Sequence, residues 1–80
     1  MKRNDFSAPD MGSLPLIEML GNRRISIEGS TGILLYEESC IRINTSKMVV
    51  SFGGRGLRVR CIGGSCVEVE GVVTEIKFIF

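Results

Sequence analysis

The amino-acid sequence predicts an all-β domain, an antiparallel meander of about six or seven short strands that forms a small barrel or a two-layer sandwich or roll. Short stretches of alternating apolar and polar residues recur along the chain, and clusters of Gly, Ser, Asn or Glu separate them. No segment keeps the helical period of an amphipathic helix. Such a sheet has to curl or fold on itself to bury one face, and the pattern does not choose between a barrel and a layered form.

The composition is typical of a small globular domain. The chain has 80 residues, of which 44% are hydrophobic and 24% are charged, and this balance separates it from disordered proteins. A domain of this size buries only about 60–65% of the surface that its unfolded chain exposes, so its stability margin is small. The formal net charge of +1 creates no overall field that would attract nucleic acid or an anionic membrane.

The ends of the chain suggest one domain after a short leader. Residues 1–13 are polar and small, without periodicity, and are predicted to be a flexible leader to a single domain at residues 14–80. No apolar stretch follows the cations at the start, so we expect no secretory signal and a cytoplasmic protein. Residues 14–20 are too few and too interrupted to cross a bilayer. We interpret them as a strand, although Pro15 would also suit the first turn of a short helix.

The reactive side chains favour neither catalysis nor metal binding. Cys40, Cys61 and Cys66 form an odd set without an export signal, so we expect three free thiols rather than a disulfide framework. The chain has no histidine, which removes the commonest general base and leaves too few ligands for a structural zinc site. Glu37 and Glu38 are neighbours and should point to opposite sides. We therefore expect no enzyme activity, no metal and no cofactor.

Two connections are predicted in the first half of the domain. The alternating residues 41–43 are expected to turn at Ser46 and Lys47 onto a strand at residues 48–52. Residues 29–32 are rich in Gly, Ser and Thr and should link the apolar strands on either side of them. Near-neighbour connections are therefore expected throughout the sheet.

A glycine-rich segment after residue 52 predicts a tight hairpin. Placing Phe52 opposite Leu57 on the inner face leaves Gly54 and Arg55 as the two central residues of the turn. A two-residue type II′ turn requires glycine at its first central position, so Gly54 is expected at positive φ.

The next hairpin is predicted from its charges. Arg58 and Arg60 share one face of a strand, and Glu68 and Glu70 share one face of the following strand. Pairing Arg58 with Glu70 and Arg60 with Glu68 places opposite charges across the ladder and leaves a loop at residues 63–65. The glycines assigned to the two turns are Gly53, Gly54, Gly56, Gly63 and Gly64.

Nucleic-acid binding is the alternative function that the residues leave open. Small barrels bind single strands with a basic groove and aromatic platforms on which bases stack. The outward positions beside the arginines hold serine, glutamate and valine instead of aromatic residues, so nucleic acid is not the expected partner. The candidate basic patch consists of Arg42, Arg55, Arg58 and Arg60.

A series of short motifs runs in order through nearly all of the expected domain. They are Leu14-Pro15, Met19 with Gly21-Asn22, Ile25-Ser26-Ile27-Glu28, Gly32-Ile33, Tyr36, Ile41-Arg42-Ile43, Thr45, Val50, Phe52, Gly54, Leu57, Val59, Val69-Glu70-Gly71, Ile76 and Phe78. Their order and spacing resemble the YabP/YqfC family of sporulation proteins from spore-forming Firmicutes, and the YqfC branch is the closer match. Met48 stands where this family has a glycine, so the turn before it is expected to differ from the usual one.

The resemblance implies a role in endospore formation in the mother cell, where YabP-type members are linked to spore-coat assembly. It supplies no catalytic residues. It implies a cytoplasmic structural or adaptor module that acts in endospore morphogenesis through protein–protein contacts. The expected partners are other sporulation proteins, some of them membrane-bound, or a second copy of the chain, without insertion into the membrane.

The C-terminal segment is the expected contact surface. Residues 75–80 should form an edge strand that only Lys77 protects against pairing with another chain. By the alternation along their strands, Val49, Val72 and Ile79 should point away from the core. They could then form an exposed apolar contact surface, or a two-layer fold could bury them in a second core of its own. We expect this edge to pair with a second copy or a sporulation partner. The candidate interface consists of Phe78, Ile79, Phe80, Val49 and Val72.

Overall fold

The computed structural model describes residues 14–80, except for the side chains of residues 61 and 62. All regular secondary structure in this part of the chain is β-strand, which confirms the predicted fold class. The strands are β1 (Leu16–Leu20), β2 (Arg24–Glu28), β3 (Ser30–Glu37), β4 (Cys40–Thr45), β5 (Val49–Gly63) and β6 (Cys66–Ile79). The predicted leader at residues 1–13 lies outside the described residues.

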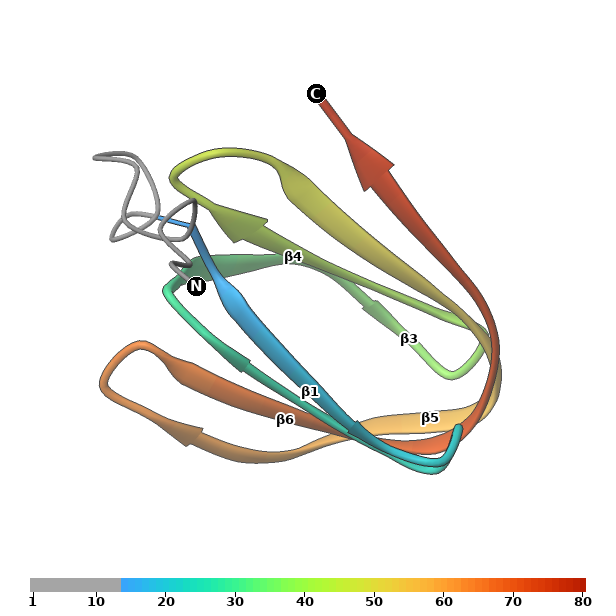
Figure 1. Ribbon diagram of the computed structural model, residues 1–80. Helices are drawn as coiled ribbons and strands as arrows, with labels where there is room; N and C mark the ends of the chain where they lie inside the picture. The colour runs from blue at the N-terminus through green and yellow to red at the C-terminus, as the bar shows by residue number, and fades with distance from the viewer. Residues whose placement is uncertain (1–13) are drawn as a thin grey trace, which may run out of the picture.

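The six strands form one antiparallel sheet in the order β1-β2-β6-β5-β4-β3. β5 and β6 pair with each other over most of their length, whereas β2 pairs only with residues 66–70 of β6 and β4 only with residues 49–53 of β5. Between these two regions the long β5–β6 ribbon bends, and the sheet folds over on itself (Figure 1). Of the predicted alternatives, the structure therefore has the two-layer form and not the barrel. Within residues 14–80 no pairing joins the edge strands β1 and β3, so the sheet is not closed into a barrel.

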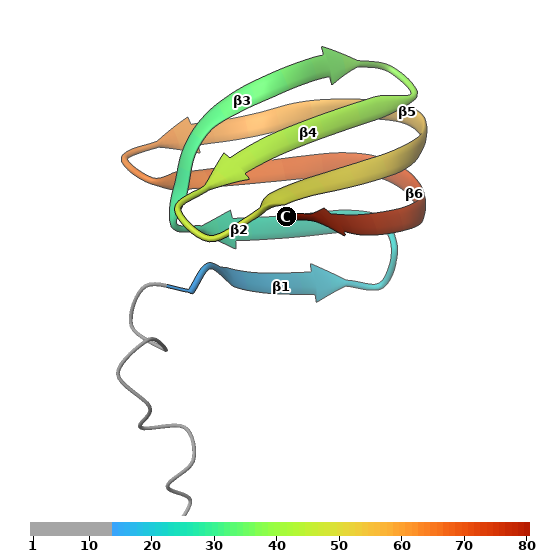
Figure 2. The same ribbon diagram turned by 90° about the horizontal axis from the view of Figure 1, so that it is seen from above.

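The fold creates two layers, each named here after its short central strand. The β2 layer contains β1, β2, the first part of β6 and the last part of β5 (Figure 1). The β4 layer contains β3, β4, the first part of β5 and the last part of β6 (Figure 2). Inward-facing apolar residues of both layers form the core, and they are Ile25, Ile27, Ile41, Ile43, Val50, Phe52, Leu57, Val67, Val69 and Val73.

The predicted hairpin at Gly53, Gly54 and Gly56 is wrong. β5 continues through this segment, and Gly53 and Gly54 lie opposite Glu75 and Val73 of β6. Apolar residues on both sides of the glycines are buried as the alternation requires, but alternation does not distinguish a strand that turns back from one that bends and continues. Two pairs of expected short strands are therefore merged into β5 and β6, which have 15 and 14 residues.

Glycines are needed here for the bend and not for a turn. Gly54 is not at positive φ, but a Cβ on it would collide with the carbonyl oxygen of Val72 and lie 3.1 Å from the Cα of Val73. Gly71 has φ of 140°, and a Cβ on it would lie 2.6 Å from the carbonyl oxygen of Gly56. Because the two backbones approach so closely at the bend, only residues without a side chain fit.

The charge-based register of the second hairpin is partly correct. Arg58 lies opposite Glu70, as predicted. A bulge after that pair places Cys61 opposite Glu68, so the predicted pairing of Arg60 with Glu68 is wrong. An extra residue in one strand shifts every later pair by one position, and the sequence carries no marker of it.

The loop of this hairpin lies where it was predicted, but it is shorter. Gly63 pairs with Cys66, which leaves Gly64 and Ser65 as the two central residues. Gly64 has φ of 57° and Ser65 is not at positive φ, an arrangement consistent with a type II′ turn. Of the two predicted turn glycines, Gly64 therefore sets the turn and Gly63 ends the strand.

Of the two connections predicted in the first half of the domain, the structure contains one as a tight turn and the other as a crossover between layers. The turn at residues 46–47 is confirmed, and the hydroxyl of Thr45 donates a 2.6 Å hydrogen bond to the carbonyl oxygen of Met48. Residues 29–32 do not join neighbouring strands, because β2 pairs with β1 and β6 while β3 pairs with β4. The chain crosses here from one layer to the other, so a pure meander was a wrong expectation. The strand interpretation of residues 14–20 is confirmed by β1.

Candidate interaction surfaces

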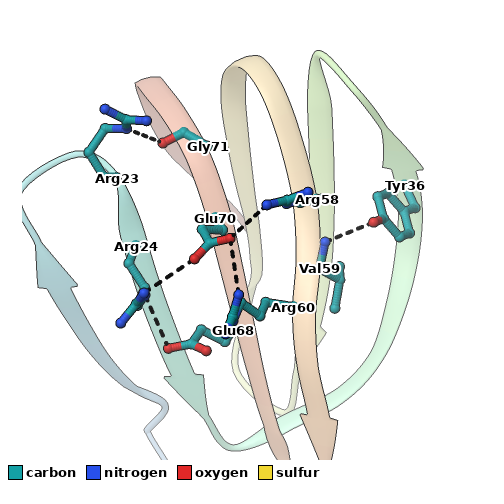
Figure 3. A network of polar contacts seen from close by, with 9 residues as sticks. All are labelled: Arg23, Arg24, Tyr36, Arg58, Val59, Arg60, Glu68, Glu70 and Gly71. Atoms are coloured by element: carbon teal, nitrogen blue, oxygen red, sulfur yellow. Dashed lines mark hydrogen bonds and ion pairs between the residues drawn. The ribbon is translucent and has the colours of Figure 1, made fainter.

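An ion-pair network covers the outer face of the β2 layer (Figure 3). Glu70 of β6 lies at its centre, since one carboxylate oxygen is 3.3 Å from Arg24 of β2 and the other is 3.3 Å from Arg58 of β5. Arg60 is 3.7 Å from the same carboxylate, and Arg24 also lies 3.8 Å from Glu68. A single carboxylate thereby links three adjacent strands. The arginine side chains of these pairs are about half exposed or more, so solvent screens the attraction and the network mainly fixes the register.

The arginines lower the pKa of Glu70. Desolvation beside the sheet acts to raise the pKa of this carboxyl group. Hydrogen bonds from Arg24 and Arg58, together with the charges of Arg60 and Arg58, act in the opposite direction and outweigh it. Glu70 is therefore a carboxylate at neutral pH, and it neutralises part of the positive charge that the three arginines bring.

An open depression of about 540 Å³ adjoins this network at the bend of the sheet. It is lined by Leu20, Arg23, Arg24, Glu38, Gly56, Leu57, Arg58, Glu70 and Gly71. The side chain of Arg23 donates a 3.0 Å hydrogen bond to the carbonyl oxygen of Gly71, as Figure 3 shows. Two bend glycines, Gly56 and Gly71, contribute no side chains to its wall, and on that wall Arg24 and Arg58 pair with Glu70.

The predicted basic patch is not brought together in one place. Arg58 and Arg60 lie side by side on β5 and share Glu70. Arg42 belongs to β4 in the other layer, where its Nε donates a 3.4 Å hydrogen bond to the hydroxyl of Ser51. Arg55 lies at the bend, opposite Val72 of β6. The four arginines therefore do not line a common groove for a polyanion.

Exposed apolar side chains lie on three strands of the described part, which are β1, the last part of β6, and β3 with Leu34 and Tyr36. β1 is the edge strand of the β2 layer (Figure 2), and the exposed residues on it are Leu16, Met19 and Leu20. At the end of β6, Phe78 is 52%, Ile79 is 39% and Phe80 is 92% exposed. The end of β6 extends away from the two-layer body (Figure 1), so the opposite layer does not cover it.

The structure divides the predicted interface residues into two groups. Phe78, Ile79 and Phe80 are exposed, whereas Val49 and Val72 are half-buried. Val49 lies opposite Ile79 in the β5–β6 ladder, so it adjoins the exposed group, but Val72 lies at the bend. Among residues 14–80, the described buried apolar side chains belong to the one core between the layers, and Val49, Val72 and Ile79 are not part of it.

The sequence reasoning missed the exposed residues of β1. Residues 16–20 read Leu-Ile-Glu-Met-Leu, so this strand is apolar on both faces. That pattern usually marks a strand buried on both sides. Here the same pattern occurs in a short edge strand, where it produces an exposed apolar surface. Whether such a strand is buried or exposed depends on its position in the sheet.

The described cysteines form no disulfide, and the Sγ of Cys40 lies 3.7 Å from the hydroxyl oxygen of Ser51. Cys40 and Cys66 are free thiols, and the side chain of Cys61 lies outside the part of the structure that is described. No group of three His, Cys, Asp or Glu residues that could hold a metal ion occurs among the described residues. The described residues also contain no helix long and apolar enough to span a membrane.

No family model, curated protein or solved structure matches this chain.

Proposed function

We propose that this protein is a non-catalytic structural or adaptor module of endospore formation, which takes part in spore morphogenesis or coat assembly by binding other sporulation proteins. The assignment to sporulation, and to the cytoplasm of the mother cell, rests on the sequence motifs that resemble the YabP/YqfC family. The mode of action rests on the surface of the molecule, and the two supports are independent.

The observation that carries the interaction role is the exposed apolar end of β6. Phe78 and Ile79 end β6 and expose apolar area on its two faces, and the exposed Phe80 follows directly after the strand. Exposed apolar surface of this kind on a small domain marks a contact site for another protein. An exposed strand can also donate its backbone groups to a partner strand, which adds directional hydrogen bonds to the apolar contact.

The charged surface favours this function over nucleic-acid binding. Binding of a nucleic acid requires arginines that are free to neutralise phosphates. Here Arg58 and Arg60 flank Glu70, and Arg24 lies between Glu68 and Glu70. These carboxylates would repel a phosphate backbone at the point where the arginines lie closest together.

Affinity capture from sporulating cells tests both parts of the proposal. The wild-type protein should retain identifiable coat or morphogenesis proteins, and Ile79→Lys should lose them because it places a charge in the contact. Leu34→Lys is the matched control, since Leu34 is also an exposed apolar residue but lies on β3, at the far edge of the sheet. Equal capture by the wild type and Ile79→Lys would show that the end of β6 is not the binding surface, and capture of no sporulation protein would count against the assigned process.

A further inference from the structure

The last part of β6 has a backbone edge without a partner. Close to the bend the β1–β2 turn covers this edge, because the N–H of Val73 donates a 2.9 Å hydrogen bond to the carbonyl oxygen of Asn22 and the Asn22 side chain donates one of 3.0 Å in return. Beyond Val73, one side of β6 pairs with β5, and no backbone group among residues 14–80 pairs with the other side. Residues 74–79 therefore present an open strand edge.

The opposite flank of the roll is closed. The hydroxyl of Tyr36 on β3 accepts a 2.8 Å hydrogen bond from the N–H of Val59 on β5, across the gap between the two layers (Figure 3). The N–H of Leu57 likewise donates a 2.9 Å hydrogen bond to the carbonyl oxygen of Glu38 in the β3–β4 turn. The fold thus covers the free side of β5 as far as Val59 and leaves residues 74–79 of β6 open.

Charges on the open edge are arranged so that it can pair with itself. Glu75 and Lys77 lie on the same face of β6, and both side chains are largely exposed. The Nζ of Lys77 is 3.8 Å from a carboxylate oxygen of Glu75. In an antiparallel pair of identical strands related by a twofold axis, each face meets the same face, so residues of equal parity lie opposite each other. Centring the pair on Ile76 places Glu75 of each copy opposite Lys77 of the other.

Other registers lack this complementarity. If the twofold axis passes through Lys77, the lysines of the two copies lie directly opposite each other. If it passes through Glu75, the two glutamates do. Like charges directly opposite each other in a ladder are destabilising. Centring on Phe78 leaves both charges without an opposite charge. Charge complementarity therefore selects one register.

We infer that this edge binds a second copy of the chain, so that β6 pairs with β6 in antiparallel orientation and the two β4 layers join into one continuous sheet around Ile76. The inference rests on the proposed interaction role and specifies its partner as the chain itself. In this register Phe78 of each copy lies opposite Thr74 of the other, within the open edge, so the second copy would cover part of the exposed Phe78 ring.

A charge-exchange experiment tests this pairing with the full chain. In Lys77→Glu both positions are acidic, and in Glu75→Lys both are basic, so each variant alone opposes like charges twice in the dimer. Each should dimerise at least tenfold more weakly than the wild type in analytical ultracentrifugation, which corresponds to about 1.4 kcal/mol. An equimolar mixture of the two variants should recover dimers, and so should the double exchange Glu75→Lys with Lys77→Glu. Far-UV circular dichroism and the urea midpoint check that each variant is folded, as expected for exposed side chains.

The outcomes separate this inference from the proposed function. A wild type that stays monomeric at several hundred micromolar overturns the pairing, as does a mixture that associates no better than its components. If in that case the capture of sporulation proteins still depends on Ile79, the edge serves another protein and the proposed function stands. A wild type that dimerises in the predicted charge-dependent way but captures no sporulation protein would support the pairing and contradict the proposed function.

Discussion

Replacing Gly54 by alanine tests whether the bend of the β5–β6 ribbon depends on a close backbone contact. The added Cβ would collide with the carbonyl oxygen of Val72 and lie 3.0 Å from its carbonyl carbon, so backbone and not a flexible side chain would have to move. Overpacking of this kind costs about 1–3 kcal/mol, and an 80-residue domain has roughly 4–12 kcal/mol of stability in total. We expect a loss of about 3 kcal/mol, which lowers Tm by roughly 12–24 °C in a domain of this size.

Two further alanine variants separate the contact from backbone conformation. Gly56 has φ of 62° with open space around its Cβ position, so Gly56→Ala should cost only the left-handed strain of about 1–2 kcal/mol. Gly32 has neither positive φ nor a neighbour within 4 Å, so Gly32→Ala should change stability by less than about 0.5 kcal/mol. Urea denaturation of the three variants gives the comparison. A midpoint for Gly54→Ala equal to that of Gly32→Ala would refute the close approach at the bend.

Other predictions concern the charges, the β4–β5 turn and the start of the chain. The pKa of Glu70 is lowered in the folded state, so its ionised form contributes stability above the unfolded pKa of about 4.3, and this is lost as pH falls through the folded value. Glu70→Gln should therefore be less stable than the wild type at pH 7, and the urea midpoints of the two should converge as pH falls through the lowered folded pKa of Glu70. Thr45→Val should cost about 1–3 kcal/mol in urea denaturation, because the buried Thr45 hydroxyl donates to the Met48 carbonyl and accepts from the Met48 N–H. Deleting residues 1–13 should leave Tm unchanged in a thermal melt, because the described core lies between Ile25 and Val73; a large drop would assign those residues to the fold.

Alternation of apolar residues was enough to predict the fold class and the inward position of Phe52 and Leu57. Ile41, Ile43, Val50 and Phe52 are all fully buried, and they pair across the β4–β5 ladder as their parity requires. Parity works because a one-residue slip would move all four side chains to the outer face, which makes the correct register far more stable than its neighbours. The all-β assignment and the turn at residues 46–47 follow from the same rule.

The bend was missed because local sequence patterns do not record which distant strand lies alongside. Gly54 was expected to provide positive φ in a turn, but it is required because Val72 of β6 approaches its backbone. Glycine satisfies either demand, so its presence alone cannot separate them. The same applies to the pairing of β2 with β6, since these strands are far apart in sequence and no motif announces their contact.

Only part of the candidate interaction surface was predicted, because contacts between distant strands are not visible in the sequence. The exposed end of β6 could be expected from three consecutive apolar residues with little charge, whereas residues 14–20 were predicted only to form a strand, without a position in the sheet. The pairing of Arg58 with Glu70 was predicted correctly. Arg24 pairs with the other carboxylate oxygen of Glu70, but it lies on β2, and the contact between β2 and β6 was not predicted from the sequence. Side chains that meet across distant strands cannot be grouped before the strand order is known.

The open edge of β6 follows from the bend itself. A two-strand ribbon that folds over has one short strand beside each of its halves, β4 beside the first part of β5 and β2 beside the first part of β6. Beyond the bend, β5 no longer pairs with β4 and β6 no longer pairs with β2. In the other layer, each of these two long strands therefore has one side without a neighbouring strand. On β5 that side is closed by Tyr36 and the β3–β4 turn, whereas on β6 the β1–β2 turn reaches only as far as Val73. The surface for association is thus a consequence of strand topology, and substitutions at the bend such as Gly71→Ala should disturb it without touching any residue of the contact.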